Sequence, residues 1–188
     1  RKLVANALWD KTYRGRIIPV VGDLAQPLFG LTQQDFDHLA EVIDVIYHNG
    51  AVVSFIQPYR ALKGPNVDGT QQIIRLATQS KVKPLHYVST VFVFGARKHF
   101  DGRVIDEDEA LDEHDEPLLG YFQSKWVAEK LVTLAREQGL PVFIYRPGVI
   151  IGASQSGTWD NPDDFICRLI KGCIQLGMWP TVQAEWYL

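Results

Sequence analysis

The fold class is decided by three stretches: PLHYVST at 84–90, LLGYFQSKWVAEKLVTLAREQ at 118–138 and PVFIY at 141–145. The first and third are short and rich in β-formers, and the middle one reads as a long helix. A strand followed by a helix and a second strand implies parallel pairing, since the helix returns the chain to the end of the sheet at which it started.

The same alternation extends through the rest of the chain. We expect strands at 17–21, 43–48, 85–89 and 142–145, and helices at 32–41, 66–79, 118–138 and 163–175. Thr32 and Asp35 have the spacing of a helix-capping box. The strands lack clean apolar–polar alternation, which favours cover by helices on both faces. The sequence therefore predicts an α/β fold with a doubly wound parallel sheet.

Small or polar residues follow each expected strand. Such sheets bind ligands at the carboxyl ends of their strands. Any one of these sequences is also explained as an ordinary turn, but four together favour a binding edge. They are Gly22-Asp23, Asn49-Gly50-Ala51, Ser89-Thr90 and Arg146-Pro147-Gly148.

Composition narrows the function classes. The chain has 188 residues with 19 Lys and Arg against 22 Asp and Glu, a net charge of −3, so neither nucleic acid nor an anionic membrane is an expected partner. The apolar runs are too short for a membrane span, and a cytoplasmic location is expected. Cys167 and Cys173 are expected to be core thiols, and the scattered histidines do not have the spacing of metal ligands.

Tyr121 and Lys125 are the strongest candidates for catalytic residues. Residues four apart share a helix face, so the ammonium is expected near the phenol, where it favours the phenolate and lowers the phenol pKa. An ordinary amphipathic surface is the alternative reading. A second copy, Tyr59 and Lys63, has no strand end carrying a hydroxyl before it. We therefore assign Tyr59 to packing or to the lining of the substrate side.

Six motifs together resemble a known family. They are Gly22-Asp23-Leu24, His48-Asn49-Gly50-Ala51, Asn66-Val67-Asp68-Gly69-Thr70, His86-Tyr87-Val88-Ser89-Thr90, Tyr121-Phe122-Gln123-Ser124-Lys125 and Tyr145-Arg146-Pro147-Gly148. In this order they are similar to extended short-chain dehydrogenase/reductases with a male-sterility-type NAD-binding domain. The stretches KWVAE at 125–129 and KGCIQLG at 171–177 resemble the thioester reductase domains of nonribosomal peptide and polyketide synthetases.

The resemblance implies a catalytic triad of Thr90, Tyr121 and Lys125. Thr90 would hold the substrate carbonyl oxygen, with Ser89 as runner-up, Tyr121 would protonate that oxygen, and Lys125 would bind the nicotinamide ribose. The resemblance also implies further cofactor contacts: Asp23 to the adenine, Asn49, Gly50 and Ala51 on the phosphate or ribose side, Asn66 in support, and Pro147, Gly148 and Val149 at the nicotinamide carboxamide.

A glycine-rich phosphate turn is missing from the sequence. Dinucleotide folds carry it after their first strand, but no two of the 15 glycines are two or three residues apart. We expect residues 1–188 to be part of an NAD(P)-binding Rossmann-like domain without its first two strands and its C-terminal substrate subdomain, and residues 1–5 to be helical. Either those parts lie outside this chain or cofactor binding has been lost. The chain alone is expected to bind NADPH poorly.

The expected function is NAD(P)H-dependent reductive release of an acyl or peptidyl thioester from a phosphopantetheinyl carrier domain, as an aldehyde or alcohol. The resemblance favours NADPH, with NADH as the alternative. Two other functions remain open at this point: an extended-type dehydrogenase or epimerase acting on a sugar nucleotide or alcohol, and a cofactor-free interaction remnant.

Overall fold

A computed structural model describes residues 4, 9–95, 105–111, 119–159, 161 and 164–181 of the chain. The chain divides into two compact units, one of Val21–Gly148 and one of Arg1–Val20 with Val149–Leu188. The first unit contains the sheet and almost all of the candidate site residues. None of the described helices is long and apolar enough to cross a membrane.

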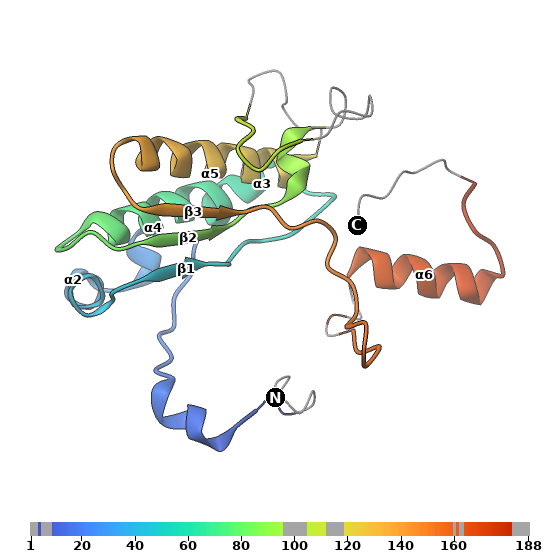
Figure 1. The fold of residues 1–188 in the computed structure, drawn as a ribbon, viewed down its shortest axis with the longest axis horizontal. Coiled ribbons are helices and arrows are strands. Elements are labelled where there is room, and N and C mark those ends of the chain that lie inside the picture. The colour runs from blue at the N-terminus through green and yellow to red at the C-terminus, as the bar shows by residue number, and fades with distance from the viewer. Residues whose placement is uncertain are drawn as a thin grey trace. The chain divides into compact units, whose positions relative to one another are not determined.

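The first unit is built on a three-stranded parallel sheet in the order β1-β2-β3 (Figure 1). The strands are β1 (Ile46–His48), β2 (Leu85–Val88) and β3 (Val142–Tyr145), which confirms three of the four expected strands. β1 begins three residues later than expected, because its first bond to the neighbouring strand region is from Ile46 N to Pro84 O.

Helices connect the strands in the expected order (Figure 1). The first unit contains η2 (Pro27–Gly30), α2 (Gln33–Val42), α3 (Tyr59–Lys63), the π-helical turn η3 (Gly64–Asp68), α4 (Gly69–Thr78), η4 (Val91–Phe94) and α5 (Gly120–Glu137). α3, η3 and α4 follow one another directly, so the helical stretch predicted from residue 66 already begins at Tyr59. α2 starts as predicted after Thr32, whose Oγ1 accepts from Asp35 N at 3.1 Å.

The core lies between the sheet and the helices. Side chains that alternate along the strands, Ile46, Leu85, Tyr87 and Val142, are buried in one cluster with Phe36 and Ala40 of α2, Ile73, Leu76 and Ala77 of α4, and Ala128, Val132 and Ala135 of α5. Ile73 and Ala77 of α4 therefore face the sheet.

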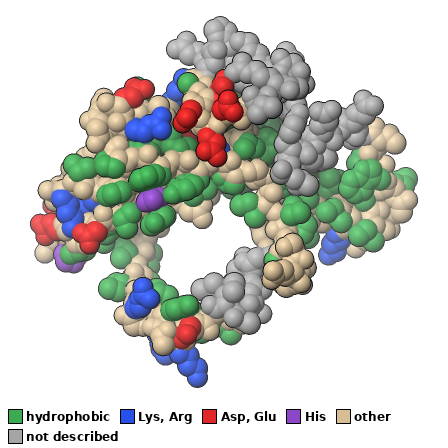
Figure 2. Space-filling view, viewed as in Figure 1, with side chains coloured by type: hydrophobic (Ala, Val, Ile, Leu, Met, Phe, Trp, Pro, Cys, Tyr) green, Lys and Arg blue, Asp and Glu red, His purple; other side chains and the backbone are tan. Residues whose placement is uncertain are grey.

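The other face of the sheet is open among the described residues of this unit. Tyr47 is 69% exposed and Phe143 51% exposed, and His86 stacks between them with ring centroids 4.3 and 4.6 Å away. Tyr145 extends this row, its hydroxyl 2.7 Å from His86 Nδ1. Figure 2 shows hydrophobic side chains with a histidine among them over the strands. The expected helical cover is thus seen on one face only.

The C-terminal end of α4 is held by a buried lysine. Lys83 Nζ donates to the backbone oxygens of Leu76 at 2.9 Å, Gln79 at 2.7 Å and Lys81 at 2.8 Å. All three ammonium donors are used, and one of them satisfies Leu76 O in the last turn of α4, where carbonyls lack helical partners. Burial lowers the pKa of Lys83.

The strand predicted at residues 17–21 is not formed. Ile18 is 86% exposed and Val21 91% exposed, and no described strand pairs with this segment. A strand needs a hydrogen-bonding neighbour, so an apolar run alone does not form one. The prediction was wrong for that reason.

The second unit contains η1 (Lys11–Arg16) and α6 (Phe165–Leu176). α6 is capped by Asp164, whose Oδ1 accepts from Cys167 N at 2.8 Å, and it ends at Gly177 with φ 64°. Cys167 and Cys173 are free thiols, but both are only half-buried, so the expectation of core thiols was wrong. α6 has no fully buried residue to form such a core.

Of the helix expected at residues 1–5, Val4 is helical and the other four residues lie outside the described part.

Candidate active site

The ammonium of Lys125 lies at the carboxyl end of β2. Lys125 extends from α5 and is almost fully buried, and its Nζ donates to the backbone oxygen of Val88 at 2.7 Å. The same nitrogen is 4.3 Å from the centre of the Tyr87 ring. An ammonium has three donors. Since the described residues accept one hydrogen bond from it, two donors remain for a ligand.

Burial lowers the pKa of Lys125 to about 8, and the negative charge of Glu129 partly opposes that effect. A lysine with this pKa is still mostly charged at neutral pH. It is therefore suited to bind hydroxyl oxygens through its two remaining donors.

Two hydroxyl side chains follow β2. Thr90 caps η4, and its Oγ1 accepts from Phe92 N at 3.4 Å, so the hydroxyl proton stays available for another acceptor. Ser89 is buried, and its hydroxyl has no hydrogen-bond partner among the described residues. Both candidates for holding a carbonyl oxygen therefore lie at the strand end and keep a donor.

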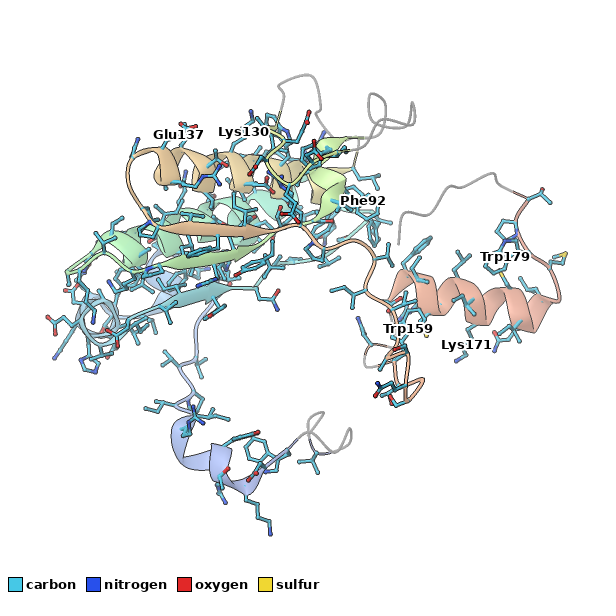
Figure 3. The ribbon with its side chains drawn as sticks, viewed as in Figure 1. Phe92, Lys130, Glu137, Trp159, Lys171 and Trp179 are labelled. Atoms are coloured by element: carbon cyan, nitrogen blue, oxygen red, sulfur yellow. The ribbon has the colours of Figure 1, made fainter. Side chains whose placement is uncertain are left out.

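Tyr121 lies in the first turn of α5 and is half-buried in an aromatic cluster. Its ring meets Phe55 edge-on at 6.1 Å and contacts Phe122 at 5.4 Å. Phe122 stacks at 4.9 Å on Phe92 of η4, which Figure 3 labels beyond the strand ends. The cluster thus ties the start of α5 to the segment that follows Thr90.

The pKa of Tyr121 is raised, and burial is the cause. The expectation that Lys125 would lower this pKa was therefore wrong for this structure. The Lys125 ammonium is engaged by Val88 O and the Tyr87 ring, and burial of the phenol dominates. A phenol with a raised pKa stays protonated at neutral pH, which suits a proton donor.

The second Tyr-x-x-x-Lys copy forms the whole of α3. Lys63 is half-exposed and forms an ion pair with Asp68 at 2.6 Å, which raises the pKa of Lys63. Tyr59 lies beside the start of α5, because a Cβ added to Gly120 would be only 2.6 Å from Gln57 O and closer still to Tyr59 N. This copy therefore carries an ion pair and a packing contact.

Asn66 joins the loop after β1 to α5. From η3, its Oδ1 accepts from Val52 N at 2.8 Å and its Nδ2 donates to Val52 O at 3.0 Å. The same Nδ2 donates to Ser124 Oγ at 2.8 Å, and Ser124 Oγ donates to Tyr121 O at 2.7 Å. One amide thus fixes the loop that follows Ala51 relative to the first turn of α5.

Leu24 is the neighbour of two motif glycines. A Cβ on Gly50 would lie 2.8 Å from Leu24 Cδ1, and a Cβ on Gly69 would lie 2.7 Å from Leu24 O. Next to it, Asp23 is exposed, and its Oδ1 accepts from Ala25 N at 2.9 Å. The structure therefore explains both glycines by packing.

The remaining predicted cofactor contacts of the first unit lie in the segments that follow β1 and β3. Asn49 is exposed and Ala51 half-buried directly after β1. Pro147 O accepts from Val91 N at 3.2 Å, which brings the chain after β3 beside η4. Gly148 is the last residue of the first unit, and Val149 belongs to the second unit.

Two polar pairs near this edge, one buried and one partly buried, were not predicted from the sequence. His48 Nε2 lies 3.0 Å from Thr70 Oγ1, and Arg146 donates from Nε to Glu129 Oε1 at 2.9 Å. For the second pair, Glu129 follows Lys125 by one helical turn and Arg146 directly follows β3, but neither position indicates that the two side chains meet. Hydrophobic patterning gives no signal for either.

The chain is similar to known proteins along nearly its whole length. Residues 1–186 match the NAD-binding family described as male sterility protein. A protein of the linear gramicidin synthase of Brevibacillus parabrevis is 47% identical over 178 residues, which cover 95% of this chain and 4% of that protein. L-2-aminoadipate reductase of Schizosaccharomyces pombe is 38% identical over 188 residues, covering 95% of this chain and 13% of that protein.

Among solved structures, the terminal R domain from the myxalamid PKS-NRPS biosynthetic pathway is 49% identical, with a TM-score of 0.87. The match covers 96% of this chain and 45% of that one. The chain therefore spans less than half the length of each of these relatives.

Proposed function

This chain belongs to the NAD-binding male sterility protein family, and from that membership we propose that it forms part of a reductase that uses NAD(P)H to release a carrier-bound acyl or peptidyl thioester as an aldehyde or alcohol. The name of the relative in Schizosaccharomyces pombe is also that of a reductase. The sugar-nucleotide and cofactor-free alternatives are not favoured by these names.

The observation that carries the proposal is the position of the Lys125 ammonium. It is anchored on Val88 O, two residues before Thr90, and it belongs to the helix that presents Tyr121 one turn earlier. Reduction of a carbonyl needs a hydrogen-bond donor, a proton source and a cation, which the Thr90 hydroxyl, the Tyr121 phenol and the Lys125 ammonium would supply.

The described residues fit a nicotinamide cofactor. The two remaining donors of Lys125 match the oxygen acceptors of a ribose diol. We assign Asp23 to the adenine, Asn49, Gly50 and Ala51 to the phosphate or ribose side, Asn66 to a supporting role, and Pro147, Gly148 and Val149 to the carboxamide, as the resemblance implies. When bound, the cofactor supplies hydride to the thioester carbonyl carbon.

The side chains of this chain would handle the oxygen and its proton. Thr90 donates a hydrogen bond to the carbonyl oxygen and stabilises the negative charge that develops on it. Tyr121, kept protonated by burial, donates its proton to that oxygen. Lys125, charged at neutral pH, holds the ribose and stabilises the phenolate that Tyr121 leaves behind.

The proposed partner is a phosphopantetheinyl carrier domain, because a terminal reductase in a peptide synthetase receives its substrate as a thioester. The preferred cofactor is NADPH. A comparison of kcat/KM for NADPH and NADH tests that preference directly.

The function is tested by following NADPH oxidation by the full-length protein with a carrier-bound acyl thioester. Tyr121→Phe should lower kcat by ~10²-fold or more with little change in NADPH affinity. Tyr59→Phe is the matched control, since it alters the other Tyr-x-x-x-Lys copy, and it should retain most activity. Equal losses in both variants, or no thioester-dependent NADPH oxidation by the wild type, would contradict the proposal.

A further inference from the structure

Glu129 is a buried carboxylate that the proposed reaction does not use. It is completely buried on α5. Arg146 approaches it with two nitrogens, Nε at 2.9 Å and Nη2 at 2.8 Å, and both contact Oε1. Oε2 is buried and has no hydrogen-bond partner among the described residues. Half of the carboxylate is therefore left without a direct contact.

Stability alone gives a poor account of this arrangement. Removing two charges from water costs about as much as their pairing returns, so a buried ion pair contributes little to stability on balance. An unpartnered carboxylate oxygen adds to that cost. Arg146 is further held by Glu107 O at 3.1 Å and by the Phe94 ring at 4.8 Å, so its position does not depend on Glu129 alone.

The position of Glu129 relative to Lys125 indicates another role. Residues four apart on a helix are neighbours on one face, with Cβ atoms about 5–6 Å apart. Lys125 is itself buried, and burial disfavours its charged form. A negative charge one turn along the same helix acts directly against that effect. Accordingly, burial lowers the pKa of Lys125 and the charge of Glu129 raises it.

The other groups around Lys125 do not supply that charge. From β2, Val88 contributes a carbonyl and Tyr87 a ring whose hydroxyl pKa is raised by burial. From β1, His48 has its pKa lowered to about 4, partly by the charge of Lys125, so it is neutral at pH 7. Among the described residues, His48, Tyr87 and Glu129 are the titratable side chains with an electrostatic or ring contact to Lys125. Tyr121 lies one turn earlier on the same helix, and Arg146 contacts Glu129.

We propose that Glu129 is a positioning residue of the active site: its buried carboxylate, fixed by Arg146, keeps the Lys125 ammonium charged and at the end of β2. This inference rests on the proposed function for its consequence, which is that Lys125 remains a donor to the ribose and a cation beside Tyr121 above neutral pH. Glu129 acts through Lys125 and contacts neither substrate nor cofactor.

The direct test is an NMR titration of the Lys125 side-chain nitrogen in the full-length protein, assigned with Lys125→Arg. In Glu129→Gln the titration midpoint should fall from about 8 by about one pH unit or more. The double variant Glu129→Gln/Arg146→Met should show the same direction, because it also lacks the carboxylate. Glu137→Gln, exposed at the far end of the same helix (Figure 3), is the control and should leave the midpoint unchanged.

The double variant separates the two roles. It removes the partly buried arginine that a single change would leave without its carboxylate, so the test can still be made if Glu129→Gln folds poorly. If Glu129 serves only as a partner for Arg146, the double variant will titrate like the wild type, and the proposal is overturned. An unshifted midpoint in Glu129→Gln overturns it as well.

The functional consequence has its own readout. The NADPH affinity of Glu129→Gln should fall about fivefold relative to wild type at pH 8 and stay unchanged at pH 6. With a titration midpoint near 7, Lys125 is charged in only a small fraction of the variant molecules at pH 8. If the NMR midpoint moves but wild-type protein does not bind NADPH, the proposed function fails while the electrostatic link stands. If wild type binds NADPH and the variant shows no pH-dependent loss, the positioning role is wrong.

Discussion

Acid should destabilise this protein through His48. The ring is buried at the end of β1, with Nε2 3.0 Å from Thr70 Oγ1. Thr70 has a single hydroxyl proton and donates it to Asn66 O at 2.6 Å. Nε2 must therefore carry a hydrogen and donate to Thr70, which defines a neutral ring with its proton on Nε2.

The size of the effect follows from the pKa. Burial, assisted by the charge of Lys125, lowers the pKa of His48 from 6.5 to about 4. Above pH 6.5 the ring is neutral in both the folded and the unfolded state, and stability is complete. As the pH falls from 6.5 to 4, His48 binds a proton in the unfolded chain but not in the folded protein. The free energy of unfolding therefore falls by ~1.4 kcal/mol per pH unit. By pH 4 the loss reaches about 3 kcal/mol.

Urea titrations of the full-length protein at several pH values between 4 and 7.5 measure this loss. His48→Asn keeps an amide donor for Thr70 but removes the titrating ring, so the difference between wild type and variant isolates His48 from the carboxylates that titrate in both. That difference should grow by about 3 kcal/mol in favour of the variant as the pH falls. His86→Asn, on the open sheet face, should leave the loss in place. A wild-type-minus-variant difference that does not change with pH would refute the reasoning.

Three further predictions concern stability. Lys83→Met should lower the free energy of unfolding in urea by about 3 kcal/mol, because three carbonyls lose a charged donor, whereas Lys81→Met removes an exposed ion pair and should cost less than about 1 kcal/mol. Gly120→Ala should cost about 2 kcal/mol, seen as a lower Tm, because the added Cβ meets the backbone before α3, and Gly64→Ala, with its nearest neighbour 3.8 Å away, should be neutral. Thr32→Ala should cost about 1 kcal/mol and speed hydrogen exchange in the first turn of α2, and unchanged exchange there would show that the cap is unimportant.

The parts of the fold that followed from sequence are those with a local signal. The strand at 142–145 and the helix at 120–137 match their predictions closely, because β-rich runs and helical periodicity are properties of the segments themselves. Residues 17–21 have the same apolar character, but a strand exists only with a neighbour. Pairing is a property of two segments, and no single run encodes it.

Some features of the candidate site were likewise predictable from sequence, and others were not. Spacing predicted that Lys125 and Tyr121 share a helix and that Thr90 follows a strand, and the structure places them there. The pKa of Tyr121 was predicted in the wrong direction, because sequence gives the nearby cation but not the depth of burial. The pairing of Glu129 with Arg146 depends on the packing of α5 over β3, which spacing along the chain does not contain.

The contacts of Leu24 determine which of two glycines at this edge of the sheet is free to change during evolution. At position 50 the obstacle to a side chain is the Leu24 methyl group, which a smaller residue at 24 would remove. At position 69 the obstacle is the Leu24 carbonyl, which every residue at 24 possesses. Alanine at 50 can be accommodated by rotation of the Leu24 side chain or by a smaller residue at 24, whereas alanine at 69 is blocked in every background that keeps this backbone. A mutational scan should therefore find position 50 more tolerant of alanine than position 69.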